Sequence, residues 1–205
     1  MKKLLLTGFE PFGGEAINPS SVIAQDFHGK VIGNIEIIGR TIPLRFYEID
    51  NINCAYIEEF NPDIIINLGQ APRPAISYEY VAINLAHVSS ESYNCGAKPN
   101  HETLVENGPK AYFTSHHVQK LVKHLSSHKI PSYISYSAGT FGCNQIFYST
   151  MHYIHTNLNP NSVSAGFIHI PLLPEQTVKS TLSSSMSLDF MKKSIELIID
   201  FFNLR

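Results

Sequence analysis

One cysteine of the sequence stands where nucleophilic chemistry is easiest to support. Cys143 lies in "SAGTFGCNQIFY", directly after a glycine-rich turn and directly before a stretch with helical spacing. A helix N-terminus presents unpaired N–H groups and about half a positive charge, which favours a thiolate and can hold an oxyanion. An ordinary thiol is only slightly ionised at neutral pH, so such a position matters for rate. A buried structural cysteine at a tight turn fits the same local pattern, and both interpretations stay open at this point.

Two polar residues interrupt strand patterns that are otherwise apolar. His169 lies within "GFIHIP", and Glu79 lies among aromatic and β-branched residues in "SYEYVAIN". Carboxylates are rarely buried without a partner, and a nucleophilic cysteine needs a base and a group that orients the base. Glu79 and His169 are therefore candidates for the missing members of a Cys/His/acid set with Cys143. The alternative for His169 is a core histidine that is satisfied by a backbone carbonyl.

The other histidines and cysteines give little support for a metal site. His152 and His155 have the spacing of a helical metal pair, but the sequence has no HExxH pattern and no CxxC pair. Cys54 fits a packed core position and Cys95 an exposed loop, both as reduced thiols. We therefore expect no metal site. Four more histidines lie on or beside a polar-faced helix and are expected at the surface: His116, His117, His124 and His128.

Short apolar runs alternate along the chain with longer helical patterns. Apolar or alternating runs predict strands at residues 3–9, 35–44, 63–69, 77–86, 132–139 and 164–171. Apolar residues at helical spacing predict helices at residues 18–27, 46–60, 111–128, 143–158 and 188–202. Strands interleaved with helices indicate an α/β sandwich with a largely parallel sheet.

This architecture predicts where a ligand would bind. In open α/β sheets, ligands gather at the carboxyl ends of the strands, in the loops that lead into helices. The loop "TGFEPFGG", the turn "LGQAPRP", the turn before Cys143 and the residues around His169 all lie at or near strand ends. We expect them to share one crevice. The alternative for "GFEPFGG" is a phosphate-binding loop, but the segment has neither the GK[ST] ending nor the GxGxxG spacing of such loops.

Length and charge limit the classes of function. The chain has 205 residues, which suits a single domain over residues 1–205, and a formal net charge of −2 without any basic stripe. Nothing in it indicates nucleic acid or an anionic membrane as a partner. The opening "MKKLLL" has an apolar run too short for a signal peptide, and no stretch approaches the ~18 apolar residues of a membrane span. The expectation is a soluble, cytoplasmic protein.

Several long motifs resemble one known family, the pyroglutamyl peptidase I (pyrrolidone-carboxylate peptidase) family. They occur in the family's order and spacing, nearly from end to end: "LLTGFEPFGGEAINPS", "NPDIIINLGQAPRPAISYEYVAIN", "NGPKAYF", "SAGTFGCNQIFY" and "GFIHIPLLPEQ". The resemblance implies a three-layer α/β/α sandwich with a mixed, largely parallel sheet, similar in architecture to purine nucleoside phosphorylases. It also implies a cytoplasmic homodimer or homotetramer that works without a metal or cofactor.

The same resemblance implies roles for particular residues. Cys143 would be the nucleophile, His169 the general base and acid, and Glu79 the residue that orients the imidazole. The reaction implied is thiolate attack on the amide after an N-terminal pyroglutamyl residue of a peptide, through a thioester acyl-enzyme. The positions that match the family's lactam pocket are Phe9 and Phe12, which would sandwich the ring, Gln70 at the lactam, and Asn18, which would support that glutamine.

Two departures from the family pattern fall on the substrate side of the expected site. The family usually has an Ala-Arg-Ile-Pro-Asp-Asn segment after the "VAIN" strand, whereas residues 85–99 here contain no arginine. Lys98 and His87 are the candidates to compensate. "GQAPRP" stands where a Gly-Gly-Arg turn is usual, so Pro72 and Arg73 replace two flexible residues. The alternatives kept open are a catalytically weakened relative that binds pyroglutamyl ligands, and a phosphorylase-like enzyme on the same architecture.

Overall fold

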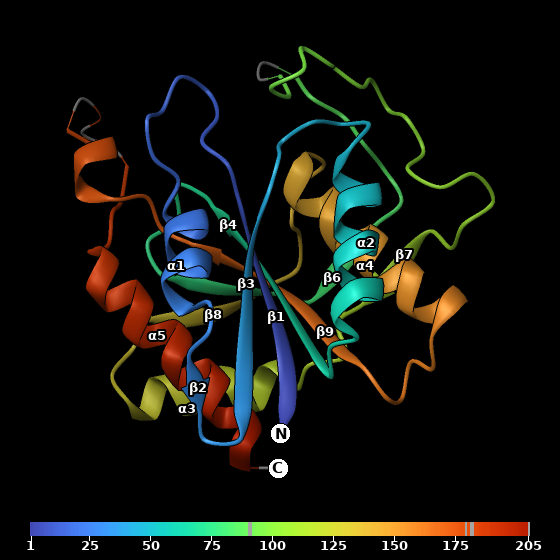
Figure 1. Ribbon diagram of the computed structural model, residues 1–205. Helices are drawn as coiled ribbons and strands as arrows, with labels where there is room; N and C mark the ends of the chain where they lie inside the picture. Colours follow the sequence, from blue (N-terminus) through green and yellow to red (C-terminus); the bar gives the residue numbers. More distant parts are fainter. Residues whose placement is uncertain (90–91, 179, 181–182, 205) are drawn as a thin grey trace.

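A seven-stranded sheet runs through the middle of the molecule (Figure 1). The computed structural model describes residues 1–204 except 90–91, 179 and 181–182. Listed in sheet order, the strands are β2 (Val31–Ile32), β3 (Ile35–Ile42), β1 (Lys2–Phe9), β4 (Ile64–Gln70), β9 (Ser164–Ile170), β5 (Ile76–Glu79) and β8 (Ser132–Ser135).

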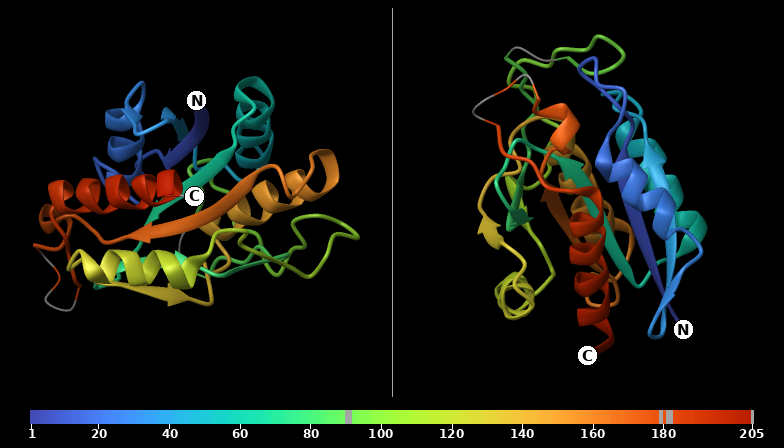
Figure 2. Two further views of the ribbon diagram at one scale, coloured as in Figure 1. Left: turned by 90° about the horizontal axis from the view of Figure 1, so that it is seen from below. Right: turned by 90° about the vertical axis from the view of Figure 1, so that its left-hand side faces the viewer.

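The four central strands set the direction of the sheet. β3, β1, β4 and β9 are parallel to one another, so their carboxyl ends meet at one edge. β2 is antiparallel to β3, and β5 is antiparallel to β9 and parallel to β8. The loops that follow β1 and β3 rise at the top of Figure 1, while the start of β1 and the last turn of the final helix lie at the opposite end (Figures 1 and 2). The sheet is therefore mixed and mostly parallel, as the resemblance implied.

Helices cover both faces of the sheet and make three layers. α1 (Pro19–Phe27) and α5 (Leu188–Phe201) lie to the left of the sheet in Figure 1, and α2 (Ile49–Phe60) and α4 (Gly142–Asn157) lie to the right. α3 (Val118–Ser127) packs with β8 and α5. This arrangement confirms the α/β/α sandwich.

The apolar strands explain why helices are needed on both faces. Successive side chains of a strand point to opposite faces, so Leu4 and Leu6 of β1 pack with α1 and α5, while Leu5 packs with α2 and α4. Ile65 of β4 is fully buried on the α2 side in the same way. A continuous apolar run is typical of a strand that is buried on both faces.

Two predicted elements differ in the structure. The predicted strand 77–86 breaks at Tyr80 into β5 and a short β6 (Val81–Ile83). The predicted helix 111–128 begins instead with β7 (Ala111–Phe113), which pairs with β6 in a separate two-stranded sheet. β7 is extended because that pairing and the burial of the Tyr112 ring outweigh the local helical pattern.

One histidine predicted at the surface is buried. His116 is 5% exposed, and its Nδ1 lies 2.8 Å from the hydroxyl of buried Tyr78. The expectation of exposure was therefore wrong for His116. His117 and His128 are exposed as predicted, and His124 is half-buried. His116 precedes α3, which begins at Val118, so it does not belong to the polar face of that helix.

Candidate active site

Cys143 is the second residue of α4, and the start of this helix has no side-chain cap. The residue before the helix, Phe141, is extended and provides no side-chain cap for the first-turn N–H groups. The Cys143 side chain is half-buried against β4. A Cβ added at Gly69 of β4 would lie 2.7 Å from Cys143 Sγ, so only glycine leaves room for the sulfur there. The predicted strand–turn–helix placement of this cysteine is confirmed.

The first turn of α4 is fixed by the two polar residues that follow the cysteine. Asn144 accepts from the backbone N–H of Ile83 at 2.9 Å and donates to the carbonyls of Ile83 and Leu85. Gln145 donates to the carbonyl of Phe46 at 2.8 Å. These bonds tie the helix start to β6 and to the loop after β3. The thiol is therefore held by its neighbours rather than left on a mobile turn.

His169 and Glu79 form a buried hydrogen bond. His169 is the penultimate residue of β9, and its Nδ1 lies 2.7 Å from Glu79 Oε1. The two side chains are 3% and 0% exposed. The register explains the meeting, because Ser77 of β5 pairs with His169 and Glu79 follows two residues later on the same face. With Nδ1 committed to Glu79, Nε2 is the nitrogen that remains for a ligand.

A third residue joins this pair, and sequence reasoning missed it. Arg73, in the turn between β4 and β5, donates through one guanidinium nitrogen to Glu79 Oε1 and to Ser77 Oγ, each at 2.6 Å. Its other terminal nitrogen donates to the carbonyl of Ser137 at 3.0 Å. The signal in the sequence was the turn "GQAPRP" itself, where an arginine stands six residues before a strand carboxylate.

The surroundings of His169 favour the neutral imidazole. Burial lowers the pKa of His169 from its ordinary value, and the hydrogen bond and negative charge of Glu79 oppose that effect. The positive charge of Arg73 lowers the pKa further. A neutral imidazole bound to a carboxylate through Nδ1 can accept a proton at Nε2. The pair therefore has the arrangement of a general base.

A cavity of about 360 Å³ opens at the carboxyl ends of the central strands. It falls within the usual range for small-molecule sites. It confirms the predicted crevice, because each of the four expected segments contributes to it. The lining residues are Phe12, Gly13, Glu15, Gln70, Ala71, Pro72, Ala138, Phe141, Cys143, His169 and Leu172.

Two of the four residues predicted to bind a ligand line this cavity. Phe12 does so beside Phe141, with ring centroids 6.1 Å apart and a steep angle between the rings. Gln70 also lines it, and its Oε1 accepts from Gln176 Nε2 at 3.2 Å. Phe141 was missed by sequence reasoning, although an aromatic residue two positions before the candidate thiol was visible in "GTFGC".

The other two, Phe9 and Asn18, are not among the residues that line this cavity. Phe9 is 2% exposed and belongs to the core on the α2 side. Asn18 caps α1 by accepting from the Ser20 N–H at 3.0 Å, and it donates to the Glu10 carbonyl. The structure thus places Asn18 in the support of the loop after β1, while Gln176 contacts Gln70. A direct role of Phe9 or Asn18 toward a ligand stays a prediction.

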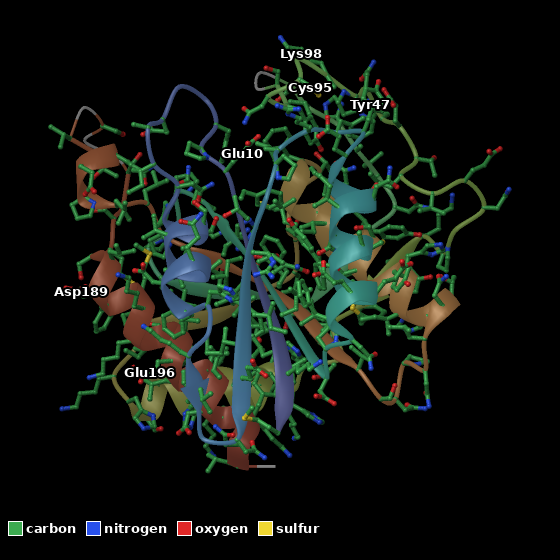
Figure 3. The ribbon with its side chains drawn as sticks, viewed as in Figure 1. Glu10, Tyr47, Cys95, Lys98, Asp189 and Glu196 are labelled. Carbon is green, nitrogen blue, oxygen red and sulfur yellow. The ribbon has the colours of Figure 1, made fainter. Side chains whose placement is uncertain are left out.

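Residues 92–99, within the segment that lacks the arginine, lie on an outer loop above the site end of the sheet (Figure 1). Cys95 and Lys98 lie on this loop, near Tyr47 (Figure 3), and both side chains are exposed. The backbone of His87 is hydrogen-bonded to Thr140, in the turn before Cys143, and its ring is stacked on that of His101 at a centroid distance of 4.1 Å. Neither candidate for compensation is among the residues that line the cavity.

Metal ligation and disulfides find no support in the part of the chain that the structure describes. No group of three His, Cys, Asp or Glu side chains there is arranged to hold a metal ion. His152 and His155 instead bind the Tyr112 hydroxyl and the Met151 carbonyl through their Nδ1 atoms. All three cysteines lie in described segments and are outside disulfides. Among the described helices, not one has the length and apolar character to cross a bilayer.

The chain resembles named peptidases both in sequence and in fold. The chain is 43% identical over 201 residues to the pyrrolidone-carboxylate peptidase of Bacillus cereus (strain G9842), an alignment that covers 98% of this chain and 92% of the relative. Its fold matches the crystal structure of pyroglutamyl peptidase I from Bacillus amyloliquefaciens with a TM-score of 0.90, at 39% identity over 96% of this chain and 92% of the other. The pyrrolidone carboxyl peptidase from Thermococcus litoralis matches with a TM-score of 0.94, at 38% identity over 100% of this chain and 95% of the other.

Fold and relatives together define an α/β peptidase. The family model described as pyroglutamyl peptidase matches residues 2–202. The chain therefore belongs to the pyroglutamyl peptidase family.

Proposed function

We propose that this chain is a cysteine peptidase that hydrolyses the amide bond after an N-terminal pyroglutamyl residue of a peptide. Cys143 is the nucleophile, His169 the general base and acid, and Glu79 the residue that orients and stabilises the imidazole. The observation that carries the proposal is the buried 2.7 Å bond between Glu79 and His169, because the imidazole of His169 lines the same cavity as Cys143. The names of the relatives support the choice of substrate.

The first half of the reaction makes the thioester. His169 Nε2 takes the proton of the Cys143 thiol, and the sulfur attacks the carbonyl carbon that joins pyroglutamate to the next residue. The C=O electron pair moves onto oxygen, where the uncapped N–H groups at the start of α4 stabilise the oxyanion. When the oxyanion collapses, the C–N bond breaks and His169 returns its proton to the leaving amine.

The second half regenerates the enzyme. His169 takes a proton from water, and the resulting hydroxide adds to the thioester carbonyl. Collapse of this second intermediate expels the Cys143 sulfur, which recovers a proton from His169. Pyroglutamate leaves as the free acid. Each proton transfer needs only the thiol, the imidazole, water and the leaving amine, and Glu79 acts by holding His169 in place.

The cavity suits a small, uncharged, flat lactam. The rings of Phe12 and Phe141 offer apolar faces to such a ring. Because Gln70 Oε1 accepts from Gln176, the Gln70 amide N–H₂ is the end that can donate to a lactam carbonyl. Glu15 adds a carboxylate to the cavity wall and disfavours an acidic ligand.

Turnover of a fluorogenic pyroglutamyl-amide reporter by matched cysteine variants tests the proposal. Cys143→Ala and Cys143→Ser are expected to lose turnover, whereas Cys95→Ala, which removes an exposed thiol on the outer loop, is expected to keep it. Unchanged turnover in Cys143→Ala would refute the assignment of the nucleophile.

One observation favours a second candidate, a weakened relative that binds pyroglutamyl ligands without hydrolysing them. Residues 85–99 contain no arginine, and the exposed Lys98 lies outside the cavity wall. Such a protein would be stabilised against heat by pyroglutamyl peptides yet release no product in fresh reductant. The cytoplasmic location and the homodimer or homotetramer stay predictions from the resemblance, and sedimentation velocity tests the oligomer.

A further inference from the structure

The guanidinium of Arg73 joins β5 to the turn after β8, two segments that lie far apart in the sequence. It contacts Glu79 Oε1 and Ser77 Oγ on β5, each at 2.6 Å, and the carbonyl of Ser137 at 3.0 Å. Ser137 lies in the turn between β8 and α4, six residues before Cys143. One side chain therefore links the carboxylate behind the base to the turn that leads into the nucleophile.

The turn that carries Arg73 is stiff. Pro72 and Pro74 flank the arginine, which limits the backbone conformations on both sides of it. Its own N–H donates to the Ala71 carbonyl at 2.7 Å. The Arg73 side chain is only 20% exposed, and a planar fork of donors loses little freedom when it is held at several points. The guanidinium is thus preorganised rather than drawn in by a ligand.

Arg73 and His169 share one carboxylate oxygen. Glu79 Oε1 accepts from both of them, whereas Oε2 is buried and makes no hydrogen bond within the described chain. If Arg73 were absent, the carboxylate could rotate, and either oxygen could meet the imidazole. The bond to Arg73 fixes Oε1 at His169 Nδ1.

Arg73 also acts on the protonation of His169 through its charge. The groups that face it or line its cavity are Glu79 on β5, Arg73 from the turn, Cys143 at the start of α4, and Glu15 from the loop after β1. Glu79 raises the pKa of His169 and Arg73 lowers it. A carboxylate without a cationic partner would pull the imidazole toward its charged form, which cannot act as a base.

We propose that Arg73 is a positioning residue of the reaction, which locks Glu79 Oε1 onto His169, ties the Ser137 turn to that pair, and places its positive charge beside the carboxylate that faces the imidazole. This inference rests on the proposed function and deepens it. It goes beyond the Cys/His/Glu set, because Arg73 is not among the residues that line the cavity and acts through Glu79.

The test compares Arg73→Gln, Arg73→Lys and a matched control, Arg40→Gln, which removes an arginine charge that lies over the Phe60 ring. Two readouts are taken: the kinetics on a pyroglutamyl reporter, and the titration midpoint of His169 by NMR of ¹⁵N-histidine-labelled protein. His169→Asn assigns the signal. Lysine keeps the charge, but a single ammonium cannot reproduce the fork that reaches both Glu79 and Ser137.

For Arg73→Gln, kcat is expected to fall about 10-fold to 100-fold, as for other partners that orient a functional histidine, with KM nearly unchanged. The His169 midpoint is expected to move to higher pH. Arg73→Lys is expected to return the midpoint toward the wild-type value while kcat stays about 10-fold low, and Arg40→Gln to match wild type in both readouts.

An unmoved His169 midpoint in Arg73→Gln would overturn the proposal, and so would a loss confined to KM. If Arg73→Gln does not fold, Arg73→Lys decides, and wild-type kcat in that variant would overturn the locking role. If the wild-type protein turns over no pyroglutamyl reporter, the proposed function fails, but the NMR midpoints still decide whether Arg73 controls His169.

Discussion

Glu79 Oε1 lies 2.7 Å from His169 Nδ1, and the antiparallel pairing of β5 with β9 brings the two fully buried side chains together. This contact selects the tautomer of the imidazole and leaves Nε2 for proton transfer. The hydrogen bond therefore connects the strand register to the chemistry.

Replacing Glu79 with glutamine should lower kcat by about 100-fold to 10,000-fold, the range seen when general-base catalysis or its orienting acid is lost. An amide carries no charge to stabilise the imidazolium and can present its N–H₂ end to the ring. The acid limb of activity should also move to lower pH, since Glu79 raises the pKa of His169. Steady-state kinetics across pH measures both effects.

Glu58→Gln is the matched control, because Glu58 is exposed and accepts only from the Tyr153 hydroxyl among the described residues. It should leave kcat and its pH dependence at the wild-type values. Wild-type kcat in Glu79→Gln would contradict the role given to the carboxylate.

Activity of the wild-type protein should persist below the pH at which an ordinary histidine, with a pKa of about 6.5, becomes charged. Burial lowers the pKa of His169, so the base stays neutral as the pH falls through 6.5 and is lost only at the lower folded-state pKa. The acid limb of kcat/KM for a pyroglutamyl reporter measures this, and a limb above that ordinary value would be inconsistent with a neutral, buried base.

Stability should follow the same shift. Since the unfolded chain binds a proton at His169 more readily than the folded chain, this residue destabilises the fold as the pH drops below about 6.5. Urea unfolding of wild type and His169→Asn between neutral and mildly acidic pH should show a steeper loss for wild type. Parallel curves would mean that His169 contributes nothing to the pH dependence.

Gly69→Ala should damage both the fold and the site. The added Cβ would lie 2.7 Å from Cys143 Sγ and 2.8 Å from the Phe167 ring, in a wall of β4 that cannot easily retreat. Overpacking of this kind destabilises by about 1–3 kcal/mol, and displacement of the sulfur should lower kcat as well. Chemical denaturation measures the loss of stability, and reporter kinetics measure the fall in kcat.

Gly29→Ala is the control for Gly69→Ala, because it shows the cost of replacing a glycine without any contact of the new Cβ with Cys143. Gly29 has a positive φ of +78° but nothing within 4 Å of an added Cβ. It should lose some stability through backbone strain while kcat stays unchanged. If Gly69→Ala retained wild-type kcat, the sulfur would not be confined by β4.

Gln176→Glu should weaken the recognition of the lactam more than the chemistry. A carboxylate at this position still accepts from the Leu173 N–H but cannot donate to Gln70, so the Gln70 amide should turn its N–H₂ end toward Glu at position 176. The lactam carbonyl then meets an oxygen. An unmet hydrogen bond of this kind is worth about 1–3 kcal/mol, so KM should rise about 10-fold or more while kcat changes little.

Gln25→Glu provides the comparison, because the exposed Gln25 donates only to Thr41 Oγ1 among the described residues. It should leave KM unchanged. A fall in kcat with constant KM in Gln176→Glu would contradict an orienting role at the lactam.

The sequence predicted much of this site because its key residues violate local patterns. Glu79 and His169 are polar residues inside apolar strands, and Cys143 follows a glycine turn at a helix start. The alternation of strands and helices likewise predicted the sandwich and the edge at which these residues meet. Local patterns were enough to predict an element or a site residue where its position depends on burial on both faces of the sheet or on the end of a strand.

The missed features depend on contacts between distant segments. Arg73 looked like a change of turn flexibility, because nothing in its neighbourhood indicates that the guanidinium reaches Ser137, 64 residues later. His116 was predicted at the surface, since only the tertiary fold brings Tyr78 against it. β7 was assigned to a helix because its partner, β6, is distant in sequence. Such pairings override local propensity.

The most direct test of the central claim is labelling with a pyroglutamyl chloromethyl ketone, which carries an alkylating carbon next to the carbonyl that the nucleophile attacks. We expect one label per chain, attached to Cys143 in peptide maps, with loss of turnover in proportion to labelling and protection by a pyroglutamyl peptide. Complete inactivation with the label on any other residue, or full turnover by a chain labelled at Cys143, would contradict the account.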